Sequence, residues 1–194
     1  MSAQLARKIT AEDIYKFKLV SDPIHSPATE AVAYVTTTIQ KEADGYHSSI
    51  CIVSTEKDAR TLTRAKARDS RPQWSPDGNT IAFISDRSEK RQVWMIRVTG
   101  GEAWQLTEFD DDVTDFCWSP DGRQLAVVTR QDDEESSSSG DDEEEEEKSD
   151  VKHITQIRYK SDDEGFLDPR PRNIWNVNVD GSESRQLTHS DVHD

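Results

Sequence analysis

The 194-residue sequence is poor in cysteine, glycine and long apolar runs. It contains two cysteines, eight glycines and two methionines, and hydrophobic residues make up 32% of it. Its longest apolar runs are a handful of residues, far short of the ~20 that a membrane-spanning helix needs. The first residues, MSAQLARKITAEDIYKF, lack the apolar core and small-residue cleavage site of a secretory signal. We therefore expect a cytoplasmic chain that does not bind a membrane.

Basic residues are also scarce. Lysine and arginine number 24 against 39 acidic residues, which gives a formal net charge of -15. No basic cluster is present, and an acidic surface repels phosphates, so we expect no nucleic-acid partner. Residues 131–150 alone hold 12 acids, one lysine and no apolar side chain. Because this segment can bury nothing and repels itself, we predict a disordered loop. A docking segment for a basic partner, or phosphorylation at Ser138 and Ser139, are the alternatives.

Residue types that carry chemistry are few and scattered. Cys51 and Cys117 lie in separate strand-like runs and are predicted to be reduced and buried. The segment 189–194 has two histidines and two aspartates, but it lies where a linker is expected. No G-x-S-x-G nucleophile motif and no glycine-rich phosphate loop occurs. We therefore predict no metal, no cofactor and no catalytic residue in this chain. The five histidines are His25, His47, His153, His189 and His193.

Two features of the sequence repeat in phase. The strings RPQWSPDGNTIAFIS and DFCWSPDGRQLAVVT place Trp74 and Trp118 44 residues apart. The strings VWMIRVTGGEAWQLT and IWNVNVDGSESRQLT place Trp94 and Trp175 81 residues apart. The acidic segment lies inside the 37-residue excess of the longer spacing. The third unit is therefore interpreted as an ordinary repeat that carries an inserted loop.

Each unit is predicted to contain about four short strands. In the Ser-Pro-Asp-Gly turn, proline presets φ, aspartate bonds to the backbone and glycine accepts a positive φ. The next residues alternate, with Ile81 and Phe83 on one face and Ala82 and Ile84 on the other. Four strands in roughly 44 residues are typical of a β-propeller blade, and an ordinary antiparallel sandwich is the alternative. The repeat residues are Trp74, Pro76, Asp77, Gly78, Trp94, Trp118, Pro120, Asp121, Gly122 and Trp175.

The predicted fold is all-β, a partial and unclosed propeller of about three blades. An N-terminal arm, 1–21, carries a short helix over 11–18 behind a capping box. The blades are placed at 22–63, 74–107 and 118–188, and the first is degenerate because Ala28-Thr29 replaces Asp-Gly. Side chains on one side of the equivalent strand should face between blades. These are Ile50, Ile52, Trp94, Ile96, Trp175 and Val177.

The number of repeats predicts that more chain follows. Leu62 and Leu106 each lie 12 residues before a tryptophan, so from Leu187 the next tryptophan would fall at position 199. Closed propellers typically have about four to eight blades. We therefore expect the sequence to be the front part of a longer protein.

The sequence also resembles a known family. The strings ITAEDIYKFKLVSDP, RPQWSPDGNTIAFISDR, GGEAWQLT, FCWSPDGRQLAVV and QIRYKSDDEGFLDPRPRNIWNVNVDGSESRQLT occur in this order. They are similar to the N-terminal propeller of prolyl-oligopeptidase-type serine peptidases, in the acylaminoacyl-peptidase or dipeptidyl-aminopeptidase-like branch. The resemblance implies a propeller that caps a C-terminal α/β-hydrolase domain and limits entry to short or acylated peptide substrates. No position here matches a catalytic motif of that family.

Two other functions remain open. A TolB-type propeller would act as a protein-binding scaffold, although TolB proteins carry a signal peptide. A free-standing adaptor would use the acidic segment to dock a basic partner. A G-x-S-x-G motif downstream of residue 194 would support the peptidase, and a stop after a closed ring would support the scaffold.

Overall fold

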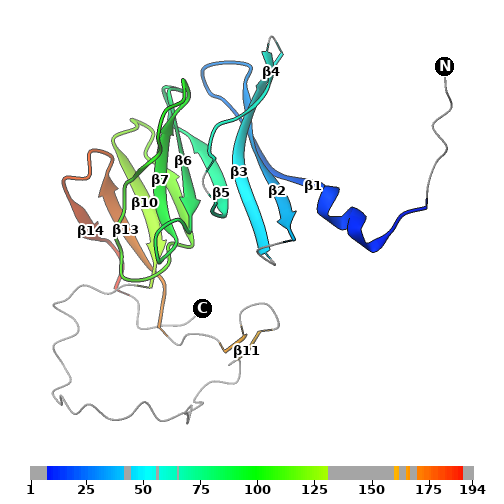
Figure 1. The fold of residues 1–194 in the computed structure, drawn as a ribbon. Helices are drawn as coiled ribbons and strands as arrows, with labels where there is room; N and C mark the ends of the chain where they lie inside the picture. Colours follow the sequence, from blue (N-terminus) through cyan, green and yellow to red (C-terminus); the bar gives the residue numbers. More distant parts are fainter. Residues whose placement is uncertain are drawn as a thin grey trace.

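The computed structural model describes residues 8–41, 45–55, 57–64, 66–130, 160–161, 165–166 and 170–189. Three four-stranded antiparallel sheets follow one another along the chain and lie side by side as a fan (Figure 1). We call them blades 1, 2 and 3. None of these sheets closes on itself within the described residues. The predicted all-β, unclosed partial propeller with a short N-terminal helix is therefore confirmed.

Every blade is an up-and-down meander in which sequence order equals spatial order. Blade 1 contains β1 (Lys18–His25), β2 (Val32–Gln40), β3 (Gly45–Ser54) and β4 (Lys57–Thr61). Blade 2 contains β5 (Asp69–Trp74), β6 (Thr80–Ser85), β7 (Gln92–Arg97) and β8 (Trp104–Gln105). Blade 3 contains β9 (Asp115–Trp118), β10 (Gln124–Thr129), β13 (Asn173–Asn178) and β14 (Ser184–Gln186). A separate pair, β11 (Lys160–Ser161) and β12 (Gly165–Phe166), lies in the insertion between β10 and β13.

The first strand of each blade precedes the boundary that the motif suggested. Trp74 and Trp118, placed at the start of blades 2 and 3, are the last residues of β5 and β9. The segment before Trp74 is polar and contains Pro72, and β9 is only four residues long, so neither sequence carries a clear alternation. In blade 1, β1 begins at Lys18, inside the predicted arm.

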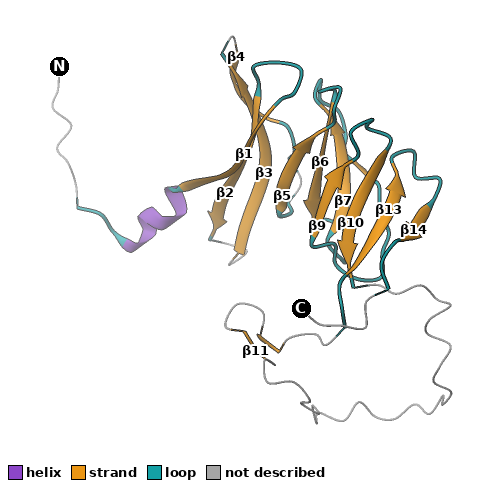
Figure 2. Cartoon of the chain, turned by 180° about the vertical axis from the view of Figure 1, so that it is seen from behind, coloured by secondary structure: helices purple, strands orange, loops and turns teal. Residues whose placement is uncertain are grey.

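The N-terminal arm contains a 3₁₀ helix, η1 (Ala11–Lys16), which Figure 2 shows at the far end of blade 1. The predicted cap is present, because the Thr10 backbone N–H donates to Asp13 Oδ2 at 2.9 Å. The helix ends two residues before the predicted position 18. The arm exposes a set of large apolar side chains. They are Ile9, Ile14, Tyr15, Phe17, Leu19 and Val20.

The apolar core is divided between the two blade interfaces. On β6, Ile81 and Phe83 pack toward blade 1, while Ala82 and Ile84 pack toward blade 3. The predicted two-faced alternation of this strand is thus confirmed. The core therefore grows by stacking sheets, as expected for blades that bury little on their own. The blade 3 side of the second interface is formed by Leu125, Val127, Trp175 and Val177.

All six side chains predicted to face between blades lie at the blade interfaces, but the predicted alignment of blade 1 is off by one residue. Ile50 and Ile52 pack toward the following blade, together with Ile81 and Phe83. Trp94 and Trp175 instead face the preceding blade.

Hydrogen bonds explain this difference. The Ile50 N–H donates to Thr63 Oγ1, and the Val93 N–H donates to Thr107 Oγ1, each at 2.9 Å. Ile50 is therefore equivalent to Val93, and not to Trp94. Ile50 and Thr63 are 13 positions apart, and Val93 and Thr107 are 14 apart, so blade 1 is one residue shorter over this span. A shift of one residue moves every side chain of a strand to the opposite face.

The first strands converge. Trp118 Nε1 donates to the Gln73 carbonyl at 3.4 Å, and Gln73 Nε2 donates to the Phe116 carbonyl at 2.6 Å. An Arg71–Asp115 ion pair at 2.9 Å also joins β5 to β9. The edge formed by β1, β5 and β9 is therefore the narrow side of the fan, and we call it the converging edge.

The insertion leaves blade 3 intact, because β10 pairs with β13 in register over six residue pairs. The loop predicted at 131–150 lies outside the described residues. In the part of the chain that the structure describes, no helix is long and apolar enough to cross a membrane.

Candidate functional site

The repeated Ser-Pro-Asp-Gly turns are closed by hydrogen bonds. In blade 2, Ser75 Oγ donates to Asp77 Oδ1 at 2.5 Å and accepts from the Thr80 N–H at 3.0 Å. Asp77 Oδ1 also accepts from the Asn79 N–H at 3.0 Å. Blade 3 repeats this pattern, since Ser119 Oγ donates to Asp121 Oδ1 at 2.6 Å. Ser75 and Ser119 therefore serve to close the turns.

These bonds perturb the turn carboxylates. The hydrogen bond from Ser75, followed by those from Asn79, holds the pKa of Asp77 below its ordinary value. The hydrogen bond from Ser119 lowers the pKa of Asp121 in the same way. In the later turn of blade 3, hydrogen bonds from Ser182 lower the pKa of Asp180. Each effect has a structural cause within the turn.

The turn glycines also pack against the preceding blade. Gly78 has φ +70°, and a Cβ there would lie 2.6 Å from Ala28 Cβ in blade 1. Gly122 has φ +70°, and its Cβ would lie 3.3 Å from Pro76 Cδ in blade 2. The glycines of the motif thus set both the turn and the spacing between blades. Pro120, the proline of the blade 3 turn, is exposed.

The repeated tryptophans link neighbouring blades. Trp74 Nε1 donates to the Ile24 carbonyl of blade 1 at 3.0 Å, the counterpart of the Trp118–Gln73 bond. Trp175 packs on Phe109 with ring centroids 5.2 Å apart. Trp94 lies under the Arg87 guanidinium, and its buried Nε1 has no hydrogen-bond partner among the described residues.

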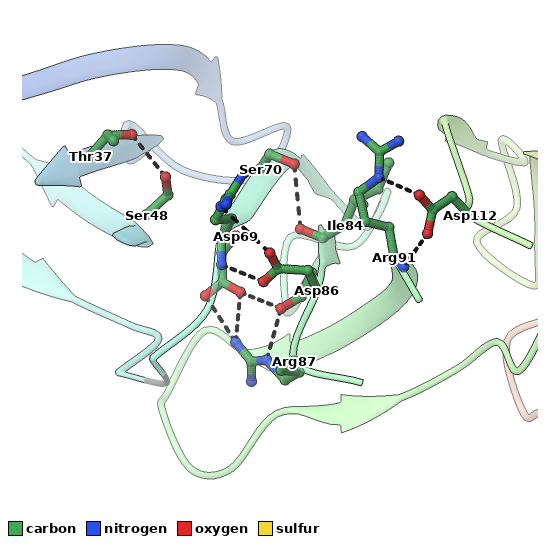
Figure 3. A network of polar contacts seen from close by, with 11 residues as sticks. Thr37, Ser48, Asp69, Ser70, Ile84, Asp86, Arg87, Arg91 and Asp112 are labelled. Atoms are coloured by element: carbon green, nitrogen blue, oxygen red, sulfur yellow. Dashed lines mark hydrogen bonds and ion pairs between the residues drawn. The ribbon is translucent and has the colours of Figure 1, made fainter. Parts of the chain in front are cut away.

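A buried ion pair was not predicted from the sequence. Arg87 Nη2 lies 2.8 and 2.9 Å from the two carboxylate oxygens of Asp69, and Arg87 Nε donates to Ser85 Oγ at 2.9 Å (Figure 3). Asp69 is fully buried, and the Arg87 side chain is 15% exposed. Neither Asp69 nor Arg87 belongs to the repeated motif, so the periodicity of the sequence carries no signal for this pair.

A second unpredicted feature lies on the converging edge. Asp22 and Arg71 have φ of +51° and +49°, which is uncommon for residues other than glycine. Both lie at irregularities in strand pairing, and each precedes a proline. Their spacing of 49 residues equals that of the first two Ser-Pro turns, so the paired X-Pro signal was available in the sequence.

The described histidines lie on or beside different strands. His25 ends β1, His47 lies in β3 and His189 follows β14, while the other two histidines lie outside the described residues. No group of three or more His, Cys, Asp or Glu in the described ranges could hold a metal ion.

The cysteine prediction is half right. Cys51 and Cys117 are both free, and Cys51 is buried. Cys117 is exposed, because β9 lies at the edge of blade 3 and this side chain points away from the interface with blade 2.

Comparisons with known proteins agree with this architecture. The TolB beta propeller domain family matches residues 6–189. The uncharacterized peptidase YuxL of Bacillus subtilis is 33% identical over 186 residues, which cover 95% of this chain and 28% of YuxL. The solved acylaminoacyl peptidase of Pyrococcus horikoshii aligns with a TM-score of 0.66 and 26% identity, covering 89% of this chain and 25% of that one.

A third similarity is shorter. The Tol-Pal system protein TolB of Bordetella pertussis is 40% identical over 58 residues, which cover 29% of this chain and 13% of TolB. The chain thus spans about a quarter of the length of the two peptidases. The resemblance to the propellers of prolyl-oligopeptidase-type peptidases is confirmed. With its three stacked blades and the match over 6–189, the chain belongs to the TolB beta propeller domain family.

Proposed function

We propose that this chain is the non-catalytic N-terminal propeller part of a cytoplasmic serine peptidase. It would control the access of short or acylated peptides to a C-terminal α/β-hydrolase domain. The observation that carries the proposal is the similarity to two peptidases along 95% and 89% of the chain, although the chain spans only 28% and 25% of them. The remaining length of such a protein is sufficient for further blades and a hydrolase domain.

The converging edge is the part of this chain that would meet a peptide. In a closed ring, the strands that approach one another most closely surround the axis. The charged residues Asp22, Arg71 and Asp115 lie at equivalent positions on β1, β5 and β9. The Arg71 and Asp115 side chains remain 53% and 51% exposed despite their ion pair. A peptide that travels along the axis would therefore encounter alternating charges.

The links between blades support a sieving role. Tryptophan–carbonyl hydrogen bonds, apolar interfaces and closely packed turns join each blade to the next. Such a wall admits an extended peptide but excludes a folded protein, whose diameter is much larger than that of one strand. Sieving of this kind requires no nucleophile in the wall itself.

The test compares this chain with the full-length product of its gene. Both would be assayed on an acylated amino-acid p-nitroanilide and a peptide p-nitroanilide, with a serine-reactive phosphonate probe in parallel. We expect turnover and labelling only in the full-length product. Labelling of the 194-residue chain would refute its non-catalytic role. An unlabelled full-length product would refute the peptidase assignment.

A protein-binding scaffold is the second candidate, and the similarity to TolB from Bordetella pertussis favours it. The two candidates differ in one measurement. A scaffold would capture a protein partner through the closed propeller but would leave both p-nitroanilides intact. A peptidase would hydrolyse at least one of them and would lose activity after phosphonate treatment.

A further inference from the structure

A groove of about 580 Å³ lies between blades 1 and 2, on the side opposite the converging edge. One wall is the end of β4 and the residues after it, and the other includes the turn that leads into β8. Both walls belong to the described chain, so the shape of the groove does not depend on further blades. The groove is therefore distinct from the axial route proposed for substrates.

The groove combines an apolar floor with a basic rim. Leu62 and Ile96 are buried residues that line it. Three guanidinium groups, from Arg60, Arg64 and Arg87, border it, and Glu102 is the one acid among its described lining residues. Asp69 compensates the charge of Arg87, so the positive charge that distinguishes this rim in a chain of net charge -15 comes from Arg60 and Arg64.

Arg87 is held in place before any ligand arrives. Its Nη2 donates to both carboxylate oxygens of Asp69, and its Nε donates to Ser85 Oγ (Figure 3). Its Cζ lies 4.9 Å from the Trp94 ring centroid. These contacts use Nε and Nη2 but not Nη1, and Arg87 lines the groove. A fixed guanidinium loses little side-chain entropy on binding a carboxylate.

The repeat provides an internal comparison for the rim. Leu62 and Thr63 are equivalent to Leu106 and Thr107 of blade 2, which fixes the alignment. At the next position, blade 1 has Arg64 where blade 2 has glutamate at 108. The fold therefore does not require arginine there, which separates the basic rim from the structural motif.

The opposite wall borders open space. Gly100 and Gly101 have φ of +100° and +117°, and no heavy atom lies within 4 Å of a Cβ placed on either. The far end is less suited to an anion, because Arg60 also lines a second cavity of about 400 Å³ that contains Glu30 and Asp58. A carboxylate would therefore be most stable near Arg64 and Arg87.

We propose that this groove binds a short acidic segment of another polypeptide. An apolar side chain of that segment would rest on Leu62 and Ile96, and an adjacent carboxylate would bind Arg64 and Arg87. Charge-assisted hydrogen bonds to guanidinium groups favour carboxylates, and the apolar floor selects a peptide over a simple anion.

The experiment uses the ¹⁵N-labelled chain and amide chemical shifts. The probe is the acetylated, amidated peptide Leu-Glu-Leu-Asp, and the control is its uncharged analogue Leu-Gln-Leu-Asn. We expect saturable shifts of the Gly100 and Gly101 amides with the acidic peptide only. Gly181, in the corresponding turn of blade 3, should not shift. Equal shifts at Gly181, or equal binding of both peptides, would overturn the proposal.

Two variants test the rim. Arg64→Glu reproduces the residue found at the equivalent position of blade 2, and it should weaken peptide binding roughly tenfold. Arg123→Glu makes the same charge change on an exposed residue of blade 3 outside the groove, and it should leave the affinity unchanged. Equal losses in both variants would indicate a general charge effect and refute the groove. Inorganic phosphate that produces the same shifts and displaces the peptide equally well would show an anion site without peptide selectivity, which also overturns the proposal.

Discussion

The buried Asp69–Arg87 pair gives the sharpest test of how burial changes the value of an ion pair. Asp69→Asn preserves the side-chain volume but removes the charge that faces Arg87. Asp69 is fully buried, Arg87 is 15% exposed, and their atoms are 2.8 Å apart. Loss of one partner from such a pair leaves a charge largely without compensation. We expect the free energy of unfolding to fall by about 3 kcal/mol, a large share of the ~5–15 kcal/mol typical of a folded protein.

The chain contains a matched control for this variant. Arg71 and Asp115 form a pair of almost the same length, 2.9 Å, but their side chains are 53% and 51% exposed. Water screens exposed pairs, so Asp115→Asn should cost less than about 1 kcal/mol. The two variants thus differ in burial and hardly at all in distance. Urea unfolding followed by tryptophan fluorescence, at one fixed protein concentration, measures both.

A double variant separates the pair from the space that it fills. Val113, which is buried, stands in blade 3 at the position equivalent to Asp69. Replacing Asp69 with Val together with Arg87→Met should recover most of the stability lost in Asp69→Asn, because an apolar pair removes both buried charges. If Asp69→Asn costs no more than Asp115→Asn, burial does not control the value of these pairs, and the reasoning fails.

Three further predictions concern the turns, acid stability and assembly. Gly78→Ala should destabilise the chain more than Gly181→Ala in urea unfolding. Both glycines have positive φ, but only at Gly78 would the new Cβ lie 2.6 Å from Ala28. The lowered pKa values of Asp77 and Asp121 mean that these carboxylates stabilise the fold above the ordinary value of 3.8 and lose that contribution as the pH falls through the lowered pKa. The urea midpoint of Asp77→Asn should therefore fall less on acidification than that of the original chain. An equal dependence of the midpoint on pH in both proteins would contradict this. The isolated chain should form oligomers or be only marginally stable, because an unclosed array exposes blade faces and strand edges. A monomeric, sharp two-state melt in sedimentation and calorimetry would refute this last expectation.

Periodicity made the blade architecture predictable from the sequence. The spacing of 44 between Trp74 and Trp118 identified the repeat, and alternation identified the two faces of β6. Both signals reflect local geometry, since a turn needs particular residues and a strand has a period of two. The same logic failed at Ile50, because the span from Ile50 to Thr63 is one residue shorter than that from Val93 to Thr107. Such a difference changes no residue type and yet reverses the face of a strand.

The unpredicted parts depend on contacts between distant residues. Asp69 and Arg87 are 18 positions apart on different elements, and nothing in either local sequence indicates a pair. Cys117 lies in a strand-like run, but its exposure follows from its place on the edge of blade 3. The converging edge carries Asp22 and Arg71 at positive φ. The equal spacing of the prolines that follow them is the one sequence signal for this backbone feature.

Repetition within one chain distinguishes what the fold requires from what it merely permits. The tryptophan–carbonyl bonds and the serine–aspartate turns recur in neighbouring blades, so they are attributed to stacking. The Asp69–Ser85–Arg87 network does not recur. Its counterpart in blade 3 has a valine at 113, and the buried hydroxyl of Thr129, at the position equivalent to Ser85, lacks a hydrogen-bond partner among the described residues.

A blade therefore folds without this network, and its buried charges are not a condition of the architecture. Its other consequence is positional, because Asp69 and Ser85 hold the Arg87 guanidinium at the rim of the groove between blades 1 and 2. Burial of an ion pair costs desolvation energy that an apolar pair would avoid. The repeat does not require this network, yet the network positions an arginine at an open groove. Ligand binding at that groove accounts for both facts.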